Sequence, residues 1–171
     1  MKTATKEISS IRLDKLPGAL EPTAIAEISK DLRPLLADVF ALYVKTKGFH
    51  WHMAGAHFRD YHLLLDEHGE QIFAMTDDIA ERARKIGGTT LHSVADIMHY
   101  KHLSDEEDNS SAEGMLSTLV ADNSELLASL RRSHEVCARH NDVATTSLIE
   151  VWIDQTERRI WFLSSILKSG F

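Results

Sequence analysis

Residues 45–88 read KTKGFHWHMAGAHFRDYHLLLDEHGEQIFAMTDDIAERARKIGG, and they decide both the fold and the candidate site of this chain. From Tyr61 to Ile86, apolar residues recur every three or four positions, which is the spacing of one face of an amphipathic helix. Gly87–Gly88 follows directly, as glycine often does where a helix ends. The stretch therefore predicts a helix over 58–86.

Apolar residues at the same spacing predict three further long helices. These are expected over 23–52, 111–139 and 144–168, with a short helix near 93–101 in the long connection before the third. Pro34 predicts a kink in the first helix or a later start, because proline lacks the N–H that a helix interior uses. Four long helices with one long middle connection are typical of an all-α four-helix bundle with a crossover.

The chain ends and the composition set further bounds. Residues 1–22 are polar and interrupted by Pro17–Gly18 and Pro22, so we expect a flexible N-terminal tail, with Thr23 capping the first helix of a single domain over 23–171. With 43% apolar residues, the 171-residue chain can bury an ordinary core. No stretch approaches the ~20 apolar residues of a membrane span, and the N-terminus lacks the apolar segment of a secretion signal.

Cysteine content and charge exclude several classes of protein. The only cysteine, Cys137, rules out a disulfide framework within the chain and a zinc site built on several cysteines. It also fits a reducing cytoplasm, which is the location we expect. The formal net charge of −7 disfavours nonspecific binding of nucleic acid by the folded body.

Two pairs of candidate metal ligands lie on the expected second helix: His62 with Asp66, and Asp77 with Glu81. The members of each pair are four residues apart and share a helix face. At about 1.5 Å per residue, His62 and Asp77 lie roughly 22 Å apart, too far to share a metal within one chain. The pairs are symmetric about the helix midpoint, so a two-fold axis there brings His62 to Glu81 and Asp66 to Asp77 of a second copy. This pattern predicts a site for iron(II), manganese or zinc that only an oligomer completes.

Spacing alone leaves a solvated helix face as the alternative for these carboxylates. Asp77 and Glu81 repel each other by a few tenths of a kcal/mol unless a cation lies nearby. Arg82 or Arg84 would meet that need without any metal. Gly69, near the helix midpoint, costs about 1 kcal/mol in a helix interior, which favours close approach of another helix.

The histidines also have structural alternatives. The alternative for Asp66 is that it orients His62 and binds no metal. His50 either adds a nitrogen ligand or merely helps to close the end of the first helix. No histidine has a glutamate three residues before it, and Asp96–His99 is the nearest approach. An intrachain di-iron site of the Glu-x-x-His type is therefore excluded.

The stretch from Lys45 to Glu81 resembles the Dps family of mini-ferritins. The matching motifs are FHW (49–51), GAHF (55–58), HLLLD (62–66) and DDIAER (77–82). The four-helix pattern extends the resemblance over about 23–168, and Trp161–Phe162 also looks like the family.

The resemblance implies a ferritin-like bundle that assembles as a hollow homododecamer. It implies a ferroxidase that oxidises iron(II), usually with hydrogen peroxide, and stores iron(III) mineral inside, which protects against oxidative stress. It assigns a two-iron site at the dimer interface, also open to zinc or another divalent metal, to His50, His62 and Asp66 of one subunit with Asp77 and Glu81 of its two-fold mate. Trp51 matches an aromatic residue thought to intercept radicals.

Family members have acidic entry pores at their three-fold axes, and many bind DNA through a basic tail. The candidate pore residues are Asp142, Glu150 and Asp154, and the alternative is that they belong to an ordinary solvated helix face. The candidates for mineral nucleation on the inner surface are Glu67 and Glu70. The alternative function is a DNA-binding shell that compacts the nucleoid, with secondary iron chemistry. Because this tail is nearly neutral, we expect weak or absent DNA binding at neutral pH, and nucleoid association only as the alternative to a freely cytoplasmic protein.

Overall fold

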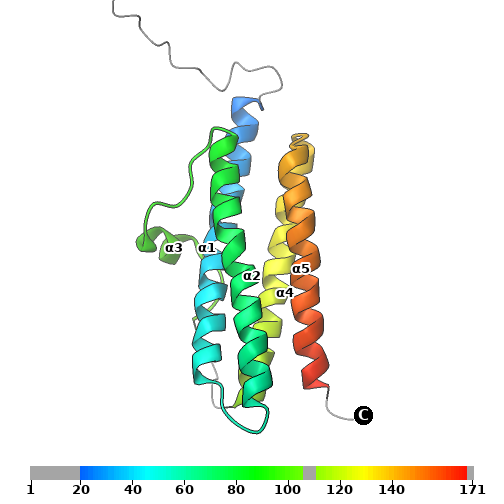
Figure 1. The fold of residues 1–171 in the computed structure, drawn as a ribbon. Helices are drawn as coiled ribbons and strands as arrows, with labels where there is room; N and C mark the ends of the chain where they lie inside the picture. Colours follow the sequence, from blue (N-terminus) through cyan, green and yellow to red (C-terminus); the bar gives the residue numbers. More distant parts are fainter. Residues whose placement is uncertain (1–19, 106–110, 169–171) are drawn as a thin grey trace, which may run out of the picture.

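The structure, a computed structural model, describes residues 20–105 and 111–168. These residues form four long helices and one short helix, namely α1 (Pro22–His52), α2 (Phe58–Lys85), α3 (Val94–Tyr100), α4 (Ala112–Arg139) and α5 (Val143–Leu167). Figure 1 shows the four long helices side by side in one bundle, with α3 outside it next to α1. The predicted all-α four-helix bundle with a short helix in its middle connection is confirmed.

The bundle consists of two antiparallel helix pairs, α1 with α2 and α4 with α5. Gly55, with φ of 109°, turns the chain between α1 and α2, and Asn141, with φ of 55°, turns it between α4 and α5. The connection from α2 to α4 returns along the bundle and carries α3 against α1 (Figure 1).

Two prolines explain how the observed first helix differs from the expected one. α1 begins at Pro22, whose fixed φ and missing N–H suit the first turn of a helix, so Thr23 is not its cap. Pro34 lies inside α1, which continues through it. The prediction of a later start is wrong, because the buried Leu35 and Leu36 continue the packed face across the proline. Residues 1–19, most of the expected tail, lie outside the described residues.

The core is apolar and lies between the four long helices. Its members include Leu36, Leu42, Leu65, Ile72, Met75, Leu119, Leu130, Ile149 and Trp152. The buried residues of α1, for example, follow intervals of three and four (Ile28, Leu32, Leu35, Leu36, Val39 and Leu42), so packing of amphipathic faces holds the bundle together. None of the described helices is both long and apolar enough to cross a membrane.

Buried polar contacts fix the connection after α3 onto the bundle. Lys45 Nζ lies 2.7 Å from Asp122 Oδ2, and the two side chains are only 6% and 11% exposed. The same ammonium group donates to the carbonyl oxygen of Ser104 at 2.7 Å. Asp38, also buried, accepts a hydrogen bond from the backbone N–H of Leu103. α1 therefore anchors both α4 and the connection.

A second buried cation is Arg159, a residue of α5 whose side chain reaches α4 and has no exposed surface. Its Nε donates to Asn123 Oδ1 at 2.9 Å and its Nη2 to Thr156 Oγ1 at 2.7 Å, so both partners are neutral. Nη1 has no partner among the described residues. Burial lowers the pKa of Arg159 to about 10, and burial together with the charge of Arg159 lowers the pKa of His68 to about 4.

We expect this histidine to make the protein less stable in weak acid. Below its ordinary pKa of 6.5, His68 binds a proton in the unfolded chain, whereas the folded chain takes it up only near pH 4. The stabilising contribution of neutral His68 is therefore complete above pH 6.5 and is lost as the pH falls to about 4, by roughly 3 kcal/mol in total. Urea unfolding at several pH values should show a shallower decline for His68→Gln than for the wild type. Equal slopes would contradict this assignment.

Candidate metal centre

His50 and His62 face each other where the end of α1 meets the start of α2. His50 Nδ1 lies 2.8 Å from the carbonyl oxygen of His62, and His62 Nδ1 lies 2.9 Å from the carbonyl oxygen of His50. The rings stack with centroids 3.7 Å apart. A carbonyl oxygen only accepts, so each Nδ1 must carry the proton and donate it. In the neutral ring, Nε2 then keeps a free lone pair, which is the state in which a histidine binds metal.

Asp66, one turn after His62 on α2, completes this half of the site. Its Oδ1 lies 3.9 Å from His50 Nε2 and 2.5 Å from Lys47 Nζ. The hydrogen bond from Lys47 lowers the pKa of Asp66, so the carboxylate stays charged. Asp66 accepts its hydrogen bond from Lys47, while the His62 ring is oriented by the backbone carbonyl of His50. The alternative that Asp66 serves to orient His62 therefore does not hold.

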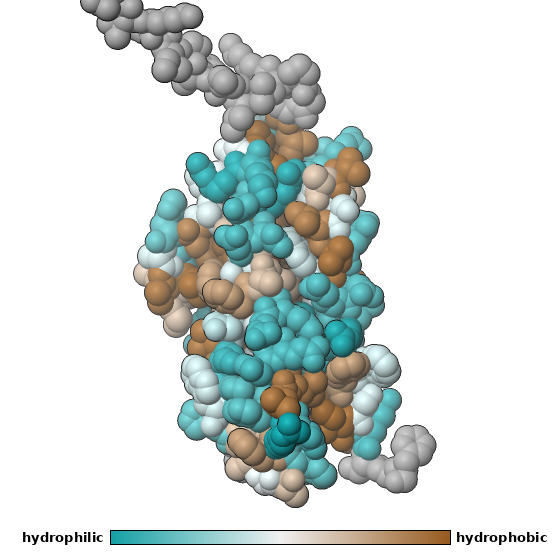
Figure 2. Space-filling model, viewed as in Figure 1, coloured by the Kyte–Doolittle hydropathy of each residue, from teal (hydrophilic) through white to brown (hydrophobic). Residues whose placement is uncertain are grey.

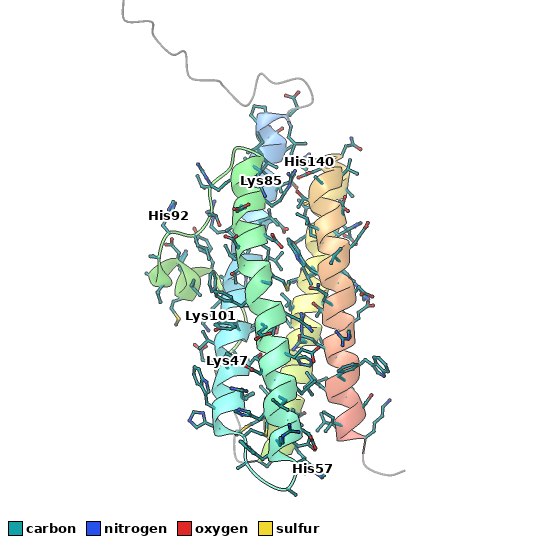
Figure 3. All side chains as sticks on the ribbon, in the orientation of Figure 1. Lys47, His57, Lys85, His92, Lys101 and His140 are labelled. Carbon is teal, nitrogen blue, oxygen red and sulfur yellow. The ribbon has the colours of Figure 1, made fainter. Side chains whose placement is uncertain are left out.

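Asp77 and Glu81 are exposed on the same stripe of α2, several turns further along. Glu81 pairs with Lys85 at 2.7 Å, and this hydrogen bond lowers the pKa of Glu81. Figure 3 shows Lys47 and Lys85 in opposite halves of the bundle. The two pairs of candidate ligands thus lie far apart in one chain. Among the described residues of one chain, no three His, Cys, Asp or Glu side chains are placed to hold a metal.

The two arginines considered as partners of Asp77 and Glu81 have other roles. Arg82 Nη2 pairs with Asp142 Oδ1 at 2.7 Å, and Arg84 donates to the carbonyl oxygen of Gly88. Lys85 is the cation found beside Glu81 instead.

Exposed apolar side chains lie next to both half-sites. Phe73, 52% exposed, lies on α2 between the two pairs and contacts the ring of Tyr43 on α1. An open groove of about 430 Å³ next to it is lined by Phe40, Phe73, Ala74, Thr76, Asp77 and Ala80. Trp51, beside His50, is 65% exposed. Figure 2 shows several apolar patches among polar residues on the visible face of the molecule.

The structure changes the interpretation of Gly69. A Cβ atom built there would lie 2.9 Å from Cδ of Lys47. The buried glycine therefore makes room for the stem of that lysine, so the helix that approaches it closely is α1 of the same chain, and a helix of a second copy is not needed to explain it. Lys47 itself was missed in the sequence, although it lies three residues before His50 and so on a neighbouring part of the same helix face.

The candidate pore residues do not form one set. Asp142 is buried, caps the start of α5 through the N–H of Thr145 and pairs with Arg82. It is a structural residue, and its assignment to a pore is corrected. Glu150 pairs with His134 at 3.0 Å, and Asp154 is exposed.

The two candidate nucleation residues also differ. Glu67 lies 3.4 Å from Arg158 on α5 and accepts a hydrogen bond from Gln71, whereas Glu70 is exposed. Glu67 already has a cation and an amide as partners, which makes it the weaker candidate.

Comparisons with known proteins agree with the fold. Residues 29–170 match the family of ferritin-like domains. An uncharacterized low temperature-induced protein of Nostoc sp. is 34% identical over 138 residues, which span 78% of this chain and 75% of that protein. The DNA protection during starvation protein 1 of Deinococcus radiodurans is 30% identical over 149 residues, spanning 86% and 72%.

A solved structure is similar as well. The crystal structure of the DPS protein from Vibrio cholerae, described as a member of a broad superfamily of ferritin-like diiron-carboxylate proteins, is 26% identical. It aligns with a TM-score of 0.83 over 87% of this chain and 94% of that one.

Proposed function

Because the chain belongs to the Dps family of ferritin-like proteins, we propose that it is a ferroxidase and iron-storage protein. It oxidises iron(II), preferably with hydrogen peroxide, and stores iron(III) mineral in a shell of twelve subunits. Iron is the substrate and the cargo. Removing iron(II) and peroxide together protects the cell against oxidative stress.

The observation that carries this proposal is the reciprocal contact of His50 and His62. Each ring is held through Nδ1 by the backbone of the other residue, so neither needs to reorganise before its Nε2 binds iron. Asp66 brings a charged oxygen to within 3.9 Å of His50 Nε2. Two imidazole nitrogens and a carboxylate suit iron(II), and also zinc.

Asp77 and Glu81 of a second subunit complete the site in this proposal. Both carboxylates are exposed in one chain, and the exposed Phe73 lies between the two half-sites on the same stripe. A two-fold contact centred near this aromatic residue would bury it and bring each pair to the opposite pair, forming two sites per dimer.

The residues of the site bind and orient the metal, which supplies the redox step. Two iron(II) ions each give one electron to a peroxide molecule, whose O–O bond breaks, and two protons complete two molecules of water. The iron(III) then hydrolyses and moves into the cavity of the shell. In this proposal Trp51, which is largely exposed and next to His50, gives up an electron to a stray radical before the radical damages the site.

Iron oxidation by the purified protein tests this function. We expect iron(II) added without oxygen to be oxidised within seconds of adding peroxide, at about one peroxide per two iron ions, and more slowly with oxygen. Light scattering should give about twelve times 19.3 kDa. A stable monomer with full activity, or no acceleration over protein-free buffer, would refute the proposal.

DNA binding stays a separate prediction. The name of the relative from Deinococcus radiodurans refers to DNA protection, but a net charge of −7 per chain opposes contact between this protein and DNA phosphates. The basic residues of the tail lie outside the described residues. The alternative function is DNA compaction in association with the nucleoid.

A further inference from the structure

A lysine already occupies the carboxylate of the histidine half-site. Lys47 Nζ lies 2.5 Å from Asp66 Oδ1, the same oxygen that faces His50 Nε2 at 3.9 Å. The side chain of Lys47 is only 18% exposed. A metal bound to His50 and Asp66 would thus meet an ammonium group that shares its carboxylate oxygen and carries the same sign of charge.

The path of this lysine is built into α2. The stem of Lys47 runs over Gly69, where a Cβ would lie 2.9 Å from Cδ and 3.6 Å from Cγ. A glycine inside a helix costs about 1 kcal/mol relative to alanine, so a residue that fills this space would otherwise be favoured. Gly48, by contrast, has no atom within 4 Å of its Cβ position.

We propose that Lys47 is the counter-ion of Asp66 that an arriving divalent metal must displace, and that Lys47 thereby sets the metal affinity of the half-site. This inference rests on the proposed function. Lys85, which pairs with Glu81, differs because both partners are more than half exposed and can separate into water. Lys47 is confined between α1 and α2, so its displacement opposes metal binding.

Calorimetry with Co(II) under anaerobic conditions tests the inference on the full-length protein. We expect Lys47→Met to lower the Co(II) dissociation constant by about tenfold, the equivalent of one charge-assisted hydrogen bond. Lys101→Met is the matched control, since Lys101 is 11% exposed and pairs with the exposed Asp105. Both variants remove one positive charge, so their difference isolates the effect of contact with Asp66.

A second variant keeps the charge and moves the lysine. Gly69→Ala should push the stem of Lys47 aside, weaken its contact with Asp66 and lower the Co(II) dissociation constant about threefold. Gly48→Ala, in open space on α1, should leave the constant unchanged. Light scattering on each variant shows that the assembly is the same.

The outcomes separate the two proposals. If Lys47→Met and Gly69→Ala bind Co(II) no more tightly than their controls, Lys47 only supports Asp66 and the inference is wrong. If the wild type binds no Co(II), or binds it as well after His62→Ala, the proposed site itself is wrong and the inference falls with it.

Discussion

Shells made only of His62→Ala subunits are expected to oxidise iron(II) with peroxide at least about 100-fold more slowly than the wild type. The substitution removes one proposed Nε2 ligand and also the ring whose Nδ1 donates to the backbone carbonyl of His50. Loss of a group that merely orients a ligand costs 10–100-fold in metal affinity or activity, so loss of a ligand should cost at least as much. Asp77→Ala shells should lose activity similarly, although Asp77 lies on a distant part of α2.

Mixed shells decide whether two chains share the site. A dimer of one His62→Ala and one Asp77→Ala subunit keeps one site with neither substitution, so a random equal mixture should recover about a quarter of wild-type sites. If each chain formed its own site from both residues, the mixture would contain no intact site. As a control, a subunit carrying both substitutions leaves no intact site in a dimer with wild type. An equal mixture of those two should retain about a quarter of the sites, whereas intrachain sites predict about half.

The second large effect is expected from Asp122→Ala, which should lower the free energy of unfolding by 3–5 kcal/mol. The substitution leaves Lys45 with its charge almost fully buried, because the ion pair at 2.7 Å is its compensation. Lys45→Met combined with Asp122→Leu should cost much less, since apolar groups of similar size then fill the same space. Urea unfolding at one fixed protein concentration measures these changes.

An exposed ion pair provides the control for this prediction. Arg131 and Glu157 lie 2.7 Å apart with side chains 60% and 48% exposed. Glu157→Ala should change the unfolding free energy by less than about 1 kcal/mol. Equal effects of Asp122→Ala and Glu157→Ala would show that burial of the Lys45 pair does not matter to stability.

The helices and the ligand pairs were predictable because both follow from spacing along the chain. Apolar residues three and four apart fixed the buried face of α2, and its observed bounds, Phe58–Lys85, lie within one residue of the expected 58–86. The same rotation per residue put His62 and Asp66 on one face. It also showed that Asp77 lies too far away to join them.

Other features depend on partners from distant segments, which spacing does not reveal. Asp142 meets Arg82 across sixty positions of sequence, so it looked like a free carboxylate. Gly69 predicted the close approach of another helix, but spacing did not show that the stem of Lys47 on α1 is what lies against it. The mutual hold of His50 and His62 also required the turn between α1 and α2 to bring their backbones together.

The buried guanidinium of Arg159 has a consequence for when iron is handled. Glu-x-x-His proteins bind metal in the middle of a bundle, but here that region contains a positive charge with neutral partners, beside a histidine that resists protonation. A divalent cation is repelled from such an interior. The proposed site lies at the boundary between subunits instead, so a subunit that has not yet assembled would be inert. In the proposed function, oxidation begins only after assembly, when a container for the insoluble product already exists.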